Sequence, residues 1–187
     1  MIYLSTLAPT VSDYFVGLPV LFPGGFYFPH TSRVSEKGFV LKEEFHVTLI
    51  GRGHQFAEKL SIKCSISLED AQIRAAHMFI EALRGQKFRA SIKKLEYFEV
   101  SKVYQKPRAH SRRTIVIPCF LESADTFYRN LAGISGISLE PTPHHITVYV
   151  GDDVFSHEGT GIVTRSEFMG HSRKIENSNW LKSMPRM

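Results

Sequence analysis

Two segments of the chain share one pattern, and this repeat is the feature that most constrains the fold. The segments are FHVTLIG at residues 45–51 and HHITVYVG at residues 144–151. In each, a histidine precedes a β-branched apolar residue, a threonine and an apolar run that ends at glycine. The two histidines, His46 and His145, lie 145 − 46 = 99 residues apart. This spacing is too long for a solenoid repeat and indicates one β-strand from each of two related lobes.

Each segment is expected to form a strand with two different faces. Apolar and β-branched residues favour strands, and the side chains of residues i and i+2 lie on the same face. His46 therefore shares a face with Thr48, and His145 shares a face with Thr147 and Tyr149. The apolar residues between them point the other way and are suited to a core. We expect each strand to present an imidazole and a hydroxyl together.

The rest of the chain predicts both helices and strands. A Ser-x-x-Asp capping signal begins a helix over residues 67–84, and Gly85 ends it. The apolar residues expected on its inner face are Ile73, Ala76, Ile80 and Leu83. A short helix is expected over residues 123–132 and another near residues 164–174. Strands are expected at residues 14–20, 26–28, 45–50, 92–100, 113–120 and 140–150. This mixture predicts an α+β fold with helices on one side of largely antiparallel sheets.

Positive charge is concentrated in one part of the chain. Residues 84–113 contain ten lysines and arginines and two acidic residues, which gives +10 − 2 = +8, whereas the whole chain carries +5. A local excess of this kind suits a polyanionic partner such as RNA or a nucleotide, although a solvated hairpin surface is an equally good interpretation. The expected strands at residues 92–100 and 113–120 would be joined by a basic loop at residues 101–112.

No signal peptide and no apolar run long enough to span a bilayer is recognised in the sequence. The two cysteines form no C-x-x-C pair, so neither a zinc site nor a thioredoxin-like motif is supported. We therefore expect a cytoplasmic protein that has no membrane partner and binds no metal or cofactor, and we expect it to be a monomer.

Paired imidazoles and hydroxyls are the groups needed to cleave a phosphodiester. One imidazole can take a proton from the attacking hydroxyl or water, and the other can protonate the departing oxygen, because the ordinary pKa of histidine is near neutrality. The hydroxyls of Thr48 and Thr147 can donate hydrogen bonds to the non-bridging oxygens, where charge grows in the transition state. The candidate catalytic residues are His46, Thr48, His145 and Thr147. Neither motif alone would carry this prediction; both together, within strands, do.

The pair HVT at residues 46–48 and HIT at residues 145–147, each followed by an apolar residue, resembles the signature of the 2H phosphoesterase superfamily. The resemblance covers residues 45–151. It implies a single bilobal domain over residues 1–187, with pseudo-twofold symmetry and two mostly antiparallel sheets around a central cleft, helices outside and a loose tail after about residue 175. It also implies a metal-independent phosphodiesterase acting on 2′,3′-cyclic phosphates or on linear or cyclic 2′,5′-linked oligonucleotides, including RNA, with RNA ligation as a related activity.

Two further residues are candidates for substrate binding. Arg52 keeps the parity of His46 if the strand continues past Gly51, and could hold a phosphate; it could equally be an exposed loop arginine. Tyr149 shares the expected face of His145 and could stack on a base, or it could pack within a lobe. Two alternatives to the enzyme remain at this point: an inactive RNA- or nucleotide-binding module that uses the same cleft, and an interaction domain in which the two motifs are coincidental.

Overall fold

The computed structural model describes residues 1–24, 26, 28, 38–104, 110–151, 160–162, 164–176 and 181. Within these residues the chain is an α+β protein whose strands form one large curled, mostly antiparallel sheet. The strands are β1 (Ile2–Thr6), β2 (Thr10–Val11), β3 (Val16–Leu21), β4 (Phe39–Leu41), β5 (His46–Ile50), β6 (Arg89–Ile92), β7 (Phe98–Tyr104), β8 (His110–Pro118), β9 (Phe120–Glu122), β10 (His145–Gly151) and β11 (Ser172–Lys174). The helices are the 3₁₀ turn η1 (Arg52–His54) and the α-helices α2 (Phe56–Cys64), α3 (Leu68–Leu83), α4 (Ala124–Ser135) and α5 (Arg165–His171).

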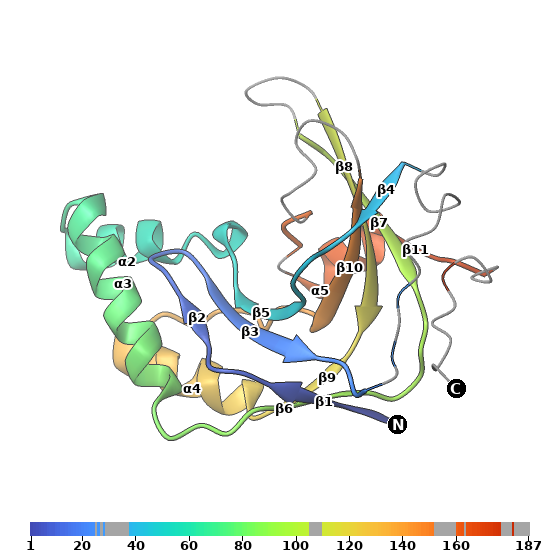
Figure 1. Ribbon diagram of the computed structural model, residues 1–187. Helices are drawn as coiled ribbons and strands as arrows, with labels where there is room; N and C mark the ends of the chain where they lie inside the picture. The colour runs from blue at the N-terminus through green and yellow to red at the C-terminus, as the bar shows by residue number, and fades with distance from the viewer. Residues whose placement is uncertain are drawn as a thin grey trace.

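The two strands that carry the repeated motif are neighbours at the centre of the sheet. The strand order is β11-β7-β8-β10-β5-β3-β1-β6-β9, with β2 beside β3 and β4 beside β10. Strands β8 and β10 rise steeply from β5, β3 and β1, so the sheet bends sharply near the junction of β10 and β5 (Figure 1). Two segments about a hundred residues apart in the chain therefore lie side by side.

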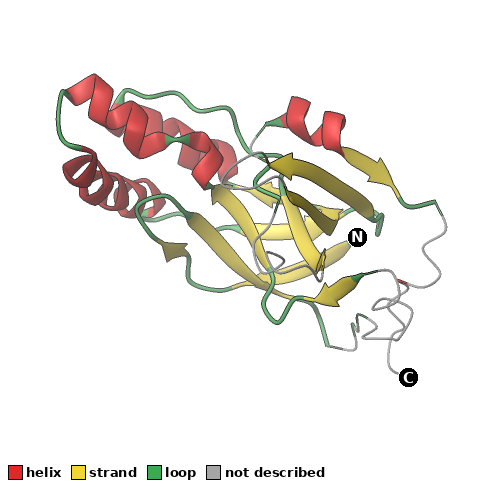
Figure 2. Cartoon of the chain, turned by 90° about the horizontal axis from the view of Figure 1, so that it is seen from above, coloured by secondary structure: helices red, strands yellow, loops and turns green. Residues whose placement is uncertain are grey.

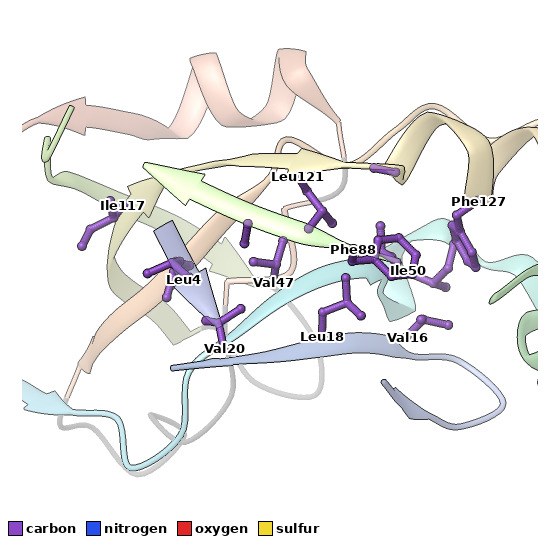
Figure 3. Close-up of a cluster of buried hydrophobic side chains, with 14 of the residues drawn as sticks. Leu4, Val16, Leu18, Val20, Val47, Ile50, Phe88, Ile117, Leu121 and Phe127 are labelled. Carbon is purple, nitrogen blue, oxygen red and sulfur yellow. The ribbon is translucent and has the colours of Figure 1, made fainter. Parts of the chain in front are cut away.

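The main hydrophobic core fills the inside of this curl. Leu4 from β1, Leu18 from β3, Val47 from β5 and Ile117 from β8 are all buried and belong to one cluster of apolar side chains (Figure 3). These side chains occupy alternate positions of their strands, as expected for strands with one face in the core. The opposite face of β5 and β10 carries the histidines and threonines of the two motifs.

Helices α2, α3 and α4 pack against one another at one end of the sheet, whereas α5 lies apart from them (Figure 2). Helix α3 begins as predicted, because the Ser67 side chain accepts a hydrogen bond from the Asp70 backbone N–H at 3.0 Å. Its predicted inner face is wrong, because Ile73 and Ile80 are 56% and 53% exposed. The buried residues of α3 are Ala71, Ala75, Phe79 and Ala82. Small alanines there allow α3 to pack closely between α2 and α4.

Several predicted strands have different bounds in the structure. The strand expected at residues 92–100 is two strands, β6 and β7, which lie in different parts of the sheet. The expected basic loop at residues 101–112 is mostly the β7–β8 hairpin, since these strands pair from Phe98 to Tyr104. The expected C-terminal helix is the short α5 followed by β11. The strand expected at residues 26–28 includes Tyr27, outside the described residues, and β1 and α2 were not predicted.

None of the helices in the described part of the chain combines the length and the apolar character needed to cross a lipid bilayer.

Candidate functional site

The antiparallel pairing of β5 and β10 brings the two His-x-Thr motifs together. Ile146 of β10 is paired with Val47 of β5. Because the strands run in opposite directions, this register places His46 beside Thr147 and Thr48 beside His145. The four side chains form a rectangle with the histidines on one diagonal and the threonines on the other. Diagonal neighbours of this kind lie roughly 7–8 Å apart at their Cα atoms.

All four side chains of the rectangle are half-buried, and they lie on the face opposite the main core. His46, Thr48, His145 and Thr147 each retain partial exposure, whereas Val47 and Ile146 between them are fully buried. We call this surface of β5 and β10 the site face. It can therefore be reached by a ligand without disturbing the core.

Tyr149 does not share the site face, which corrects the expectation from strand alternation. Thr147 is paired with Val116 of β8 and Tyr149 with Ile115, so Val148 is an extra residue that forms a β-bulge. The bulge reverses the alternation beyond Thr147. Tyr149 is 0% exposed and packs in the main core, 6.5 Å from the ring of Phe28.

Arg52 is also not where the sequence places it. Strand β5 ends at Ile50, and Arg52 begins the 3₁₀ turn η1, so the parity of His46 is not continued. Its guanidinium lies over the ring of Tyr14, 4.4 Å from the centroid. Both residues line a surface hollow of about 320 Å³ whose described lining includes none of the four residues of the rectangle. Arg52 therefore lies in the turn after β5, beside Tyr14, and not on a continued face of that strand.

A buried polar network holds the end of β5 against the segment that leads into β10. The Tyr128 hydroxyl of α4 donates to the Leu49 carbonyl at 2.5 Å and accepts from the Thr142 backbone N–H at 3.0 Å. The Thr142 hydroxyl donates to the same carbonyl at 3.0 Å. His54 accepts from the Gly51 N–H through Nδ1, so its Nε2–H is free to donate to Thr142 at 3.2 Å. The network fixes the relative position of the two motifs.

The environment of His46 favours its neutral form. Burial, the positive charge of Lys42 and the positive charge that His145 can carry, in that order, lower the pKa of His46 to about 4. The Phe15 ring meets the His46 ring edge-on, with 5.4 Å between the centroids. At neutral pH the His46 imidazole therefore has a lone pair available to accept a proton.

His145 differs from His46 in having a hydrogen-bond partner that favours its charged form. Burial lowers the pKa of His145, while the Pro143 carbonyl, 2.6 Å from Nδ1, acts to raise it. A carbonyl can only accept, so Nδ1 carries the proton and Nε2 is left for the substrate. The ring of Phe168 from α5 lies 6.1 Å away and covers one side of the imidazole.

The site has further residues that sequence patterns did not single out. Phe15 covers Gly17 of β3, which is paired with Thr48. Lys42 follows β4, and its backbone N–H donates to the carbonyl of Val148, the residue next to Thr147, which lies beside His46. Neither Phe15 nor Lys42 belongs to a motif. Only the pairing of β3 with β5 and of β4 with β10 brings them to the site face, so no local signal could have identified them.

The basic segment is partly neutralised by ion pairs within the described residues. Lys102 contacts Glu167 of α5 at 2.9 Å, and Arg113 contacts Glu99 at 2.9 Å. Arg84 pairs with Glu81 at 2.9 Å at the end of α3. Part of the local excess of positive charge therefore serves to join β7, β8 and α5 rather than to face solvent alone.

Among the described residues, the histidines outside the rectangle form no shared site. Burial lowers the pKa of His144 to about 4, and its Nε2 is buried with no hydrogen-bond partner among the described residues. In the part of the chain that the structure describes, no group of three or more His, Cys, Asp or Glu side chains is arranged to hold a metal ion.

Comparison with known proteins adds no relative from which a role could be transferred. The chain matches no protein-family model, no curated protein and no solved structure.

Proposed function

We propose that this protein is a metal-independent phosphodiesterase of the two-histidine type, acting on 2′,3′-cyclic phosphates or on linear or cyclic 2′,5′-linked oligonucleotides. The observation that carries the proposal is the register of β5 and β10, which puts both His-x-Thr motifs on one half-buried face. A separation of roughly 7–8 Å between diagonal Cα atoms leaves room for one phosphorus between the two imidazoles.

The differing environments of the two histidines support an assignment of roles. His46, kept neutral by burial and by the charge of Lys42, is the general base that takes the proton of the attacking hydroxyl or water. His145 is the general acid, because the Pro143 carbonyl stabilises its imidazolium through Nδ1 while Nε2–H gives its proton to the leaving oxygen. The attack forms one P–O bond as the bond to the leaving oxygen breaks. His46 gains the proton of the attacking group, and His145 gives its proton to the leaving oxygen.

The threonines complete the site by stabilising charge. Each hydroxyl lies beside the histidine of the other motif and can donate to a non-bridging oxygen of the phosphate. Because negative charge on these oxygens grows as the reaction proceeds, such donors stabilise the transition state more than the bound substrate.

The proposal extends to the overall arrangement implied by the resemblance, with two lobes related by a pseudo-twofold axis and a cleft between two sheets. The central place of β10 and β5 supports it: β8, β7 and β11 continue the sheet on one side, and β3, β1, β6 and β9 continue it on the other. An antiparallel strand pair has a local twofold axis, and here that axis relates one motif to the other.

The test is turnover of a panel of substrates in EDTA. The panel contains nucleoside 2′,3′-cyclic phosphates, 2′,5′-linked dinucleotides and RNA with a 2′,3′-cyclic end. We expect turnover by the unmodified protein and a loss of about 10²–10⁴-fold, the usual contribution of one general acid or base, in each of His46→Asn and His145→Asn. His77→Asn, on the exposed side of α3, is the matched control. Activity that survives either motif substitution, or that requires a divalent metal, contradicts the proposal.

The pH dependence of kcat/KM gives a second check of the same chemistry. The mechanism needs one neutral and one protonated imidazole, and the pKa of both His46 and His145 is lowered in the free protein. This singly protonated form is therefore most abundant below the ordinary histidine pKa of about 6.5. We expect kcat/KM to be highest on the acidic side of pH 6.5. An optimum above pH 8 contradicts this assignment.

A different set of results in these assays would favour the alternative, an inactive module that binds RNA or a nucleotide. In that case RNA or a cyclic nucleotide binds with strong salt dependence, no member of the panel is turned over, and His46→Asn leaves the affinity unchanged.

A further inference from the structure

Lys42 lies beside His46 because β4 and β5 pair with the same edge of β10, one after the other, with a short break between them. Leu41, at the end of β4, is paired with Tyr149, and the Lys42 backbone N–H donates to the Val148 carbonyl at 2.9 Å. His46 begins β5 one position further along β10, beside Thr147. Three residues separate Lys42 from His46 in the chain, yet the two are consecutive along the edge of β10.

The three intervening residues leave the sheet and return to it. Glu43 and Glu44 are exposed, and the Phe45 ring packs 5.5 Å from Phe22 and 5.3 Å from Phe28. This aromatic contact anchors the excursion, so its two ends are fixed next to each other. The position of Lys42 is therefore built by the fold and does not depend on a free loop.

The Lys42 side chain is directed to the site face. Leu41 packs against the main core, and the side chain of the next residue in an extended segment points the opposite way. The electrostatics agree with this direction, because the Lys42 charge lowers the pKa of His46 more than His145 does. Lys42 itself is half-buried; burial lowers its pKa, while Glu44 raises it. Among the described residues, the charged group that shifts the pKa of Lys42 is Glu44, and those that shift the pKa of His46 are Lys42 and His145.

A phosphodiester at the rectangle needs a second positive charge. The phosphate carries one negative charge in the ground state, and negative charge on its non-bridging oxygens increases during displacement. With His46 neutral, only the His145 imidazolium is positive within the rectangle itself. A half-buried ammonium next to the phosphate is a strong point-charge partner for its oxygens.

We propose that Lys42 is a substrate-binding residue whose ammonium group holds a non-bridging oxygen of the phosphate beside His46. This inference rests on the proposed function and names the cation of that site. It gives Lys42 the role of phosphate contact.

Binding of inorganic phosphate tests the inference without any turnover. Phosphate is titrated into the full-length protein at pH 7.5 and followed by NMR. Lys42→Met is expected to weaken binding by about tenfold or more, the usual effect of losing one charged hydrogen bond, and Lys42→Arg is expected to restore most of it. The matched control is Lys94→Met, because Lys94 has a highly exposed side chain paired only with Glu96 in the described structure. Equal binding by Lys42→Met and the unmodified protein overturns the inference.

Titration of the His46 imidazole provides a readout that a purely structural lysine would not change. Removal of the Lys42 charge should raise the pKa of His46 and leave that of His145 little changed, since Lys42 acts on His46. Lys42→Arg should keep the pKa of His46 low. An unchanged His46 pKa in Lys42→Met also overturns the inference.

The two proposals fail in distinguishable ways. If the substrate panel is not turned over but Lys42→Met still weakens phosphate binding by about tenfold or more, the phosphodiesterase proposal fails and Lys42 remains the cation of an anion site. If turnover is found and Lys42→Met leaves both KM and kcat unchanged, the role of Lys42 fails and the two-histidine mechanism stands.

Discussion

Gly17 shows how a residue without a side chain shapes the site. It lies in β3 opposite Thr48, and a Cβ atom there would be 2.5 Å from the Phe15 Cζ. The Phe15 ring occupies this space and meets His46 edge-on. The absence of a side chain at residue 17 therefore allows an aromatic ring to cover part of His46 and to exclude water from it.

Gly17→Ala is expected to displace the Phe15 ring without unfolding the protein. The ring is partly exposed and can move, so the stability cost should stay at the low end of overpacking, about 1 kcal/mol. Water would then reach His46, and its pKa should rise from about 4 toward the ordinary value. NMR titration of the imidazole measures this change.

Gly133→Ala is the control for this substitution, since nothing lies within 4 Å of its added Cβ on α4. If Gly17→Ala leaves the His46 pKa at the value of the unmodified protein, Phe15 does not shield the imidazole as described.

At the residue scale, the sequence carries the alternation of side chains but not the exceptions to it. The alternation accounts for the shared face of His145 and Thr147 and for the burial of Ile146. It fails at Tyr149, because the bulge at Val148 depends on pairing with β8, and the sequence has no glycine at or next to Val148 that would mark it. The place of Lys42 likewise depends on two strands sharing the edge of β10.

At the scale of elements, the network around Thr142 joins α4, the end of β5 and the start of β10. Tyr128 contributes a hydroxyl that both donates and accepts, and the groups it contacts belong to the backbones of the two segments next to the motif strands. A helix that packs on the core thereby also sets the position of the motifs.

Tyr128→Phe should therefore destabilise the protein by about 1–3 kcal/mol, because the Thr142 N–H is left buried without its partner. Urea unfolding at pH 7.5 measures the free energy. Tyr3→Phe, at a tyrosine that is 70% exposed, should change it by less than about 0.5 kcal/mol. A Tyr128→Phe protein as stable as Tyr3→Phe would show that the network contributes little.

Local capping signals predicted elements better than hydrophobic patterns did. The Ser67 cap and the left-handed Gly85 bound α3 as expected. The inner face of α3 was assigned to its largest aliphatic residues, yet the close contact with α2 and α4 selects the alanine-rich side. Packing against the neighbouring helices determines which face of α3 is buried, and the sequence of α3 alone does not contain that information.

At the scale of the whole molecule, the α+β class could be predicted, whereas the single curled sheet could not, since strand order depends on contacts between distant segments. The same long-range packing buries histidines on both faces of the sheet. Burial lowers the pKa of His46, His54, His144 and His145. In the unfolded chain these groups return to about 6.5, so the unfolded chain binds more protons below that pH.

The free energy of unfolding is therefore expected to fall as the pH is lowered from about 6.5 toward 4, by up to about 1.4 kcal/mol per pH unit for each such histidine. Urea unfolding at pH 7.5, 5.5 and 4.5 measures the slope. His144→Phe should flatten it, since this ring has an unpartnered Nε2 and a pKa of about 4.

His77→Phe, at an exposed position of α3, should leave the slope as it is. A stability that does not change between pH 6.5 and 4.5 contradicts this account.

The β-bulge at Val148 divides one strand between two tasks. Before the bulge, β10 presents alternate residues to solvent and to the core; after it, Val148 and Tyr149 both serve the core. Substitutions of His145 and Thr147, on the site face before the bulge, can thus change that face at little cost in folding, whereas those of Ile146 and of the residues beyond the bulge act mainly on folding. The site face of the strand can therefore vary while its core-facing part stays the same.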